Sequence, residues 1–87
     1  SLNLQFAEVT FTPTEEEKKY IALLNQSISN ITWSPQTRSF LDRNNIKVWG
    51  DLTNLNEAVI SKMPGANAKI VNEIKQRLLQ QGLMFRS

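Results

Sequence analysis

The sequence predicts an all-α fold, a compact bundle of four to five short helices preceded by an extended N-terminal segment. Apolar residues recur at helical spacing through most of residues 14–87. Residues that favour helix starts precede these apolar runs, and glycine or Pro-Gly turns follow some of them. We therefore expect an extended arm or linker at residues 1–13 and a single helical domain at 14–87.

Composition limits the function of this domain. The 87 residues, 40% hydrophobic and 21% charged, suffice for one hydrophobic core. Because cysteine and histidine are absent, disulfides, zinc sites with thiolate or imidazole ligands, and Ser-His or Cys-His nucleophiles are excluded. No apolar run approaches the roughly 20 residues that cross a bilayer, and no export signal is present. We expect a cytoplasmic protein without membrane segment, metal or cofactor.

The N-terminal arm has the pattern of an extended segment. Leu2, Leu4 and Phe6 alternate with polar residues, and Val9 and Phe11 continue the pattern after a shift of phase. One strand is not stable alone, so the arm lies against the helical core, pairs with another copy, or links the domain to a longer polypeptide. The sequence does not choose among these three.

A first helix is expected over residues 14–28. Thr14 and Glu17 have the spacing of a capping box, in which each side chain bonds the other residue's backbone. Apolar residues then recur at helical spacing, namely Tyr20, Ile21, Leu24 and Ile28.

A second helix is expected to start at Ser34, with Pro35 at its first position. Phe40 and Leu41 should face the core. Residues 44–45 are both asparagine, which tolerates the left-handed conformation that ends a helix.

Two further helices follow in the second half. Residues 46–49 return the polypeptide to the core, and residues 50–52 form a short helical turn. Asn56 then caps a third helix, which ends at the Met63-Pro64-Gly65 turn. The last helix spans about residues 67–81 and ends at Gly82 with Leu83 packed on Leu78. Its expected buried residues are Ile70, Val71, Ile74 and Leu78.

Charge is distributed unevenly along the sequence. Residues 1–33 contain two basic and four acidic groups, whereas residues 34–87 contain eight basic and four acidic groups. The net charge is therefore −2 in the first part and +4 in the second. A basic half suits an anionic partner, although a modest excess of lysine and arginine is as often only a solvated surface.

Catalysis is not indicated. The carboxylates of the second half are Asp42, Asp51, Glu57 and Glu73. Each falls on or near a helix surface, where capping, helix pairing and solubility are the ordinary roles. No phosphate-binding glycine loop or calcium-binding loop is present. We expect a non-enzyme with no small-molecule substrate.

The turn at residues 63–69 is a candidate phosphate site. It joins two short helices and leads into the N-terminus of the second, where Asn67, Ala68 and Lys69 stand. Free N–H groups at a helix start attract anions, and Lys69 adds a full charge, as in helix-hairpin-helix binding. The alternative is an ordinary Pro-Gly turn with small residues that pack closely.

The start of the second helix is another candidate site for DNA. Gln36 and Ser39 lie three residues apart and so point the same way, with Arg38 and Arg43 flanking them. Such side chains reach base edges or phosphates, but exposed polar helix residues also serve solubility alone.

Five segments together match the spacing of a known domain without gaps: Phe40-Leu41, Gly50-Asp51-Leu52, Glu57 to Lys62, Pro64 to Lys75, and Gly82-Leu83. Residues 31–85 thereby resemble the C-terminal domain of the bacterial RNA polymerase alpha subunit, as a divergent member. The resemblance implies binding to the minor groove of A·T-rich DNA. RNA polymerase or a transcription factor is a further candidate partner.

The expected DNA-reading positions are partly changed. The resemblance aligns an arginine with Gln36, an asparagine with Ser39, a glycine with Asn67 and a serine with Ile70, while Lys69 and Glu73 are retained. Acidic positions of the sigma-facing surface fall on Asn30 and Thr32. Losing a cation and a phosphate contact predicts weak, salt-sensitive binding to DNA. Four other basic residues compensate for this loss if they form one patch, namely Arg38, Arg43, Lys47 and Lys69.

Two functions from different classes follow. The first is a transcription-related DNA-binding module that uses Gln36 to Ser39 and Asn67 to Lys69. The second is a protein-interaction domain on the same scaffold, docking a partner through the N-terminal segment or through Trp33 and Trp49. Both tryptophans are more often core residues in so small a domain.

Overall fold

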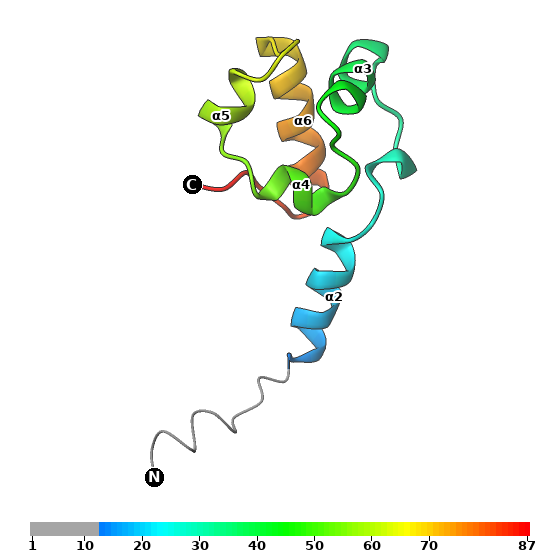
Figure 1. The fold of residues 1–87 in the computed structure, drawn as a ribbon. Coiled ribbons are helices and arrows are strands. Elements are labelled where there is room, and N and C mark those ends of the chain that lie inside the picture. Colours follow the sequence, from blue (N-terminus) through cyan, green and yellow to red (C-terminus); the bar gives the residue numbers. More distant parts are fainter. Residues whose placement is uncertain (1–12) are drawn as a thin grey trace.

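The computed structural model describes residues 13–87, and these contain five α-helices and one 3-10 turn (Figure 1). The helices are α2 (Glu15–Leu24), α3 (Pro35–Arg43), α4 (Trp49–Thr53), α5 (Glu57–Ser61) and α6 (Ala68–Gln80), and the 3-10 turn is η1 (Ile28–Asn30). The prediction of an all-α fold with four to five short helices is confirmed. The expected extended segment at residues 1–13 lies, except for Pro13, outside the described residues. None of the helices within residues 13–87 has the length and apolarity to span a membrane.

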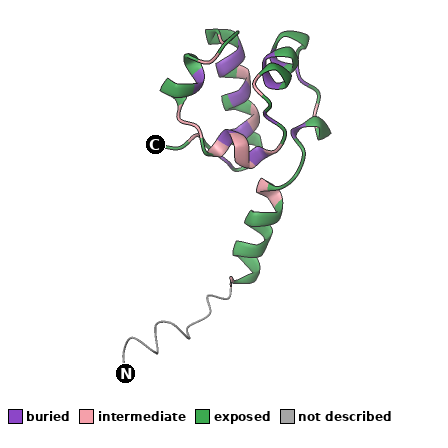
Figure 2. Cartoon of the chain, viewed as in Figure 1, coloured by how far each residue is buried: buried purple, intermediate pink, exposed green. Residues whose placement is uncertain are grey.

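The core lies between α6 and the three helices around it (Figure 2). Helix α6 buries Ile70, Val71, Ile74 and Leu78, all four residues that the sequence predicted. The other buried apolar side chains are Ile28, Trp33, Phe40, Leu41, Ile46, Trp49, Leu52, Ile60 and Leu83. At about 25 cal/mol per Å² of apolar surface, this cluster is the main stabilising term of the domain.

Both tryptophans belong to this core. Trp33 and Trp49 are 7% and 2% exposed, and their ring centroids lie 6.0 Å apart. The indole N–H of Trp33 donates to the carbonyl of Ile28 at 2.8 Å, so its polar atom has a partner despite burial. The structure confirms the core interpretation, because neither tryptophan is exposed.

The helix boundaries follow local capping chemistry. The side chains of Thr14, Ser34 and Asn56 each accept a backbone N–H from the first turn of their helix, as the sequence predicted. Helix α6 ends with Gly82 at a φ of 75°, and the Leu83 N–H donates to the Leu78 carbonyl at 2.8 Å. This is the predicted Schellman-type ending.

Helix α2 departs from the prediction in length and in environment. It ends at Leu24, not at residue 28, because Ile28 instead donates its N–H to Lys47 at 3.0 Å beside an antiparallel bridge. The helix buries no residue, and Tyr20 and Ile21 are about half exposed. Figure 1 shows α2 extending away from the bundle, attached at its C-terminal end.

The attachment of α2 depends on the absence of a side chain at Gly50. A Cβ at this position would lie 3.2 Å from the carbonyl oxygen of Leu24, closer than ordinary van der Waals contact. Glycine therefore lets the end of α2 approach the first turn of α4. The Trp49 N–H then donates to the Gln26 carbonyl at 3.2 Å and fixes the connection.

Candidate nucleic-acid interface

The start of α3 is held by a carboxylate from α6. One oxygen of Glu73 accepts the hydroxyls of Ser34 and Thr37, each at 2.6 Å, and the other accepts the Ser34 N–H at 2.9 Å. Thr37 is fully buried, so this carboxylate satisfies a hydroxyl that has no access to water. A negative charge at a helix N-terminus is also favourable to the helix dipole.

The pKa of Glu73 reflects these contacts. Partial burial raises this pKa. Its effect is outweighed by four groups that lower the pKa: the Ser34 and Thr37 hydroxyls, the Ser34 N–H and the charge of Arg77. The net result is a pKa below the ordinary value, because each of these groups favours the ionised form. Glu73, predicted as a nucleic-acid contact, is thus engaged inside the protein as an anchor for α3.

Arg77 adds a second link one turn further along α6. Its guanidinium donates to the carbonyl of Thr32 at 3.1 Å, just before α3 begins. Residues 32–37 are therefore fixed to α6 at two points.

The predicted residues of α3 divide between two sides of the helix. Gln36, Ser39 and Arg43 follow one another at intervals of three and four residues, so they share one exposed side. Arg38 lies on the opposite flank with Asp42, where both border a cavity. The structure therefore separates Arg38 from the residues that the sequence placed beside it.

The side with Arg43 adjoins the hairpin. A Cβ on Gly65 would lie 3.5 Å from the Arg43 guanidinium, and the side-chain amide of Asn44 donates to the carbonyl of Pro64 at 3.1 Å. Gly65 has a φ of 85°, which favours glycine because a side chain is strained there. The end of α3 and the turn between α5 and α6 thus pack together.

The first turn of α6 completes this surface. Asn67 caps the helix, and its side-chain oxygen accepts the Ile70 N–H at 2.9 Å. Ala68 and Lys69 are exposed, whereas Ile70 is buried. Lys69 lies four residues before Glu73, hence on the same side of α6 as the carboxylate that holds α3.

We call this surface the hairpin face and define it by Gln36, Ser39, Arg43, Asn67, Ala68 and Lys69. Its two halves are joined at both ends of α3, by Glu73 at the start and by the Gly65 turn at the end. Arg38 lies away from this face by its helical spacing, and Lys47 borders the same cavity as Arg38, so the four basic residues that the sequence singled out do not form one patch.

The carboxylates of the bundle leave the basic side chains of this face unpaired. Glu73 is bound to α3, Asp51 accepts the backbone N–H of Lys47 at 2.9 Å, and Glu57 pairs with Lys75 at 3.4 Å. The salt bridges among residues 13–87 are this last pair and Lys18 with Glu15, so Arg43 and Lys69 take part in none of them. The described residues also contain no group of acidic side chains that could hold a metal ion.

Sequence reasoning missed the cavity that Arg38 borders. Its walls come from η1, from α3 and from the segment before α4, so no local pattern marks it. The spacing of Arg38 and Asp42, four residues apart, was the one available signal that these two side chains lie together.

Comparison with known proteins agrees with the fold. Residues 14–80 match the model of a protein family described as the C-terminal domain of the alpha chain of bacterial RNA polymerase. The protein is also 32% identical over 81 residues to the DNA-directed RNA polymerase subunit alpha of Syntrophomonas wolfei subsp. wolfei. This match includes 93% of the 87 residues and 26% of the relative, so the protein spans about a quarter of that relative's length.

Proposed function

The protein belongs to the family of C-terminal domains of the bacterial RNA polymerase alpha subunit, and from this premise we propose that its hairpin face binds DNA. The family is a non-catalytic, DNA-binding domain concerned with transcription. The specific proposal is that the hairpin face contacts the minor groove and its phosphates, with a preference for A·T-rich sequence.

The observation that carries this proposal is the placement on one face of two cations that form no salt bridge within residues 13–87. Arg43 stands beside the Gly65 turn, and Lys69 stands in the first turn of α6. Phosphate binding depends on such cations because each contact releases counterions from the DNA. The polar side chains of Gln36 and Ser39 lie along the same side of α3 as Arg43 and can bond base edges or sugars.

The same geometry predicts that the binding is weak. Gln36 has a neutral amide at the position where the family has an arginine. A narrow minor groove attracts a cation more strongly than a neutral amide. The Asn67 side chain already occupies one N–H of the α6 start, and Ile70 is buried and apolar. Two lost contacts of about 1 to 3 kcal/mol each leave an association that depends strongly on salt.

A preference for A·T-rich DNA rests on the narrow groove and on Gln36. A·T pairs expose only acceptors in the minor groove, whereas G·C pairs add a donor. The Gln36 amide can donate to those acceptors, and the narrow groove of A·T-rich sequence attracts Arg43 through its stronger negative potential.

The test is a titration of the protein with A·T-rich and G·C-rich duplexes at two salt concentrations, followed by backbone amide shifts. We expect shifts at the hairpin face, tighter binding to the A·T-rich duplex, and a salt slope that falls by about 1 in Arg43→Ala or Lys69→Ala. Lys19→Ala, on exposed α2, is the matched control and should keep the full slope. The absence of shifts with either duplex at low salt would contradict the proposal.

The assembly partners are part of the same proposal. We propose that the domain works in the cytoplasm as part of an RNA polymerase or together with a transcription factor. Support comes from the relative's printed name, an RNA polymerase subunit of which these 87 residues match only a part.

The second candidate is a protein-interaction domain that has lost DNA binding. The departures at Gln36, Asn67 and Ile70 favour it, because Gln36 and Ile70 each replace a residue that contacts DNA in the family and Asn67 replaces a glycine. The titration above separates the two functions, since this candidate requires that neither duplex binds.

A further inference from the structure

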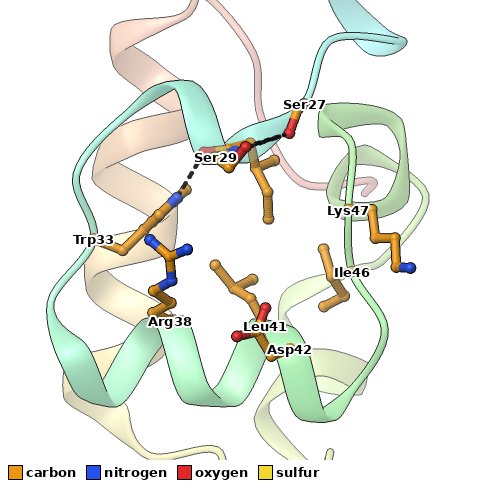
Figure 3. A pocket seen from close by; sticks show the side chains of 9 residues that line it. Ser27, Ser29, Trp33, Arg38, Leu41, Asp42, Ile46 and Lys47 are labelled. Carbon is orange, nitrogen blue, oxygen red and sulfur yellow. Dashed lines mark hydrogen bonds between the residues drawn. The ribbon is translucent and has the colours of Figure 1, made fainter.

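A cavity lies on the flank of α3 opposite to the hairpin face (Figure 3). Its floor is apolar and consists of Ile28, Trp33, Leu41 and Ile46. Each of these side chains is at most 7% exposed, so the floor is part of the packed core. The cavity is therefore bounded by side chains that also belong to the core.

The rim is polar and comes from three segments of the protein. Ser27 and Ser29 lie above the cavity and share a hydrogen bond of 2.6 Å, and Arg38 and Asp42 rise from α3 below it (Figure 3). Lys47 borders the far edge with its ammonium group directed outward. Figure 3 shows the Arg38 guanidinium pointing toward Trp33 and Ser29.

The size of the cavity limits what can enter. Its volume of about 250 Å³ falls below the range of about 300 to 1,000 Å³ that is usual for small-molecule sites. A single apolar side chain fits this space better than a cofactor or metabolite does. An apolar floor is also a poor place for a phosphate or a sugar, because their polar atoms would find no partner there.

The rim charges select an acidic ligand. Arg38 and Lys47 take part in no salt bridge within residues 13–87, so both cations are available. Asp42 is the one carboxylate of the rim, which leaves an excess of positive charge around an apolar hollow. Complementary charge at such a rim steers a partner and fixes its orientation.

We propose that this cavity is a docking site for an acidic segment of a partner polypeptide. One apolar side chain of the segment enters the hollow over Trp33 and Leu41, and carboxylates beside it contact Arg38 and Lys47. A buried apolar anchor surrounded by a polar rim is the usual organisation of a protein–protein contact.

Docking at the cavity is independent of DNA at the hairpin face. Arg38 and Asp42 project from one flank of α3, while Gln36, Ser39 and Arg43 project from the other. Both ligands can therefore bind at once, and failure to bind DNA leaves the docking proposal intact.

The test uses the 87-residue protein and a short synthetic peptide in which one phenylalanine is flanked by glutamates. A peptide with glycine in place of the phenylalanine is the control for charge alone. We expect amide shifts around Ser29, Arg38 and Lys47 with the first peptide, and none at Lys69. Equal binding of the two peptides would overturn the proposal, because the apolar cavity would then contribute nothing.

Three substitutions of exposed rim residues give effects of opposite sign. Arg38→Ala and Lys47→Ala should each weaken peptide binding about threefold, as expected for one exposed ion pair. Asp42→Asn should strengthen binding by a similar factor, because it removes the repulsive carboxylate. Lys62→Ala, a cation that does not border the cavity, should leave binding unchanged.

Filling the cavity separates docking from general charge attraction. Ser29→Tyr places an aromatic ring over the hollow on an exposed position of η1 and should abolish the preference for the phenylalanine peptide. Weaker binding in Asp42→Asn, or shifts at this rim with duplex DNA instead of the peptide, would each overturn the proposal.

Discussion

Helix α6 buries four residues of its apolar stripe, whereas helix α2 buries none of its own. Both helices start at a capping residue, Thr14 or Asn67, and both carry apolar residues at helical spacing. They differ in what surrounds them. Helix α6 has α3 on one side and α5 on the other, and α2 touches the bundle only near its last turn (Figure 1). Capping and spacing thus make a helix, and tertiary contacts decide whether that helix carries stability.

The largest test of this comparison is truncation of one isoleucine in each helix. Ile74→Ala, in a fully buried position of α6, should lower the free energy of unfolding by about 3 kcal/mol because it leaves a cavity. Ile21→Ala, about half exposed on α2, should change it by less than about 0.5 kcal/mol. Urea unfolding measures both. Similar losses for the two variants would show that α2 is packed in solution.

A smaller loss is expected when the link between α6 and α3 is cut. Glu73→Ala leaves the Ser34 N–H and the buried Thr37 hydroxyl without their acceptor, and should lower the free energy of unfolding by about 2 kcal/mol. Amide exchange should accelerate at residues 34–37. Glu16→Ala, an exposed carboxylate of α2, is the control. An unchanged exchange rate at residues 34–37 in Glu73→Ala would mean that the link does not hold α3.

The same carboxylate should give the domain a pH dependence, whose sign follows from its hydrogen bonds. The pKa of Glu73 is lowered from its ordinary value of 4.5, so its contribution to stability is present above that pH and is lost as the pH falls below it. Glu73→Gln should lack this part of the acid destabilisation, and Glu16→Gln should retain it. Unfolding midpoints measured between neutral and acidic pH test the difference. Parallel pH profiles of wild type and Glu73→Gln would contradict the expectation.

The smallest effects should come from the helix caps. Asn56→Ala removes the cap of α5 inside the bundle and should lower the free energy of global unfolding by about 1 kcal/mol. Thr14→Ala removes the cap of α2 and should raise amide exchange in that helix with little change in global unfolding. If Thr14→Ala shifted the global midpoint as much as Asn56→Ala, α2 would have to be a cooperative part of the domain.

The hairpin face shows where prediction from sequence succeeds. Gln36 and Ser39 were expected on one side of a helix, and Asn67 to Lys69 at the start of another, because capping and helical spacing are local properties. The two groups lie on connected surfaces because Glu73 binds Thr37 and Ser34, which lie 36 and 39 residues before it in the sequence. Distances of this kind cannot be read from spacing along the sequence.

Arg38 shows what spacing along the sequence leaves open. The sequence places it between Gln36 and Ser39, and only the direction of the buried side of α3, fixed by Thr37, Phe40 and Leu41, turns it toward the cavity. The same limit applies to Glu73, which the family resemblance marks as a nucleic-acid position and whose carboxylate accepts hydrogen bonds from Ser34 and Thr37.

By itself, the sequence determined where the helices begin and end in the bundle, which residues of α6 are buried, and that the second half is basic. These properties depend on a few neighbouring residues: a side-chain oxygen at a cap, a glycine with positive φ, an apolar stripe. Only the tertiary structure decided that α2 stands outside the core, that Glu73 anchors α3, and that Arg38 faces a cavity. Each of these results from the packing of distant segments against one another, because burial is shared among elements that no single stretch of sequence contains.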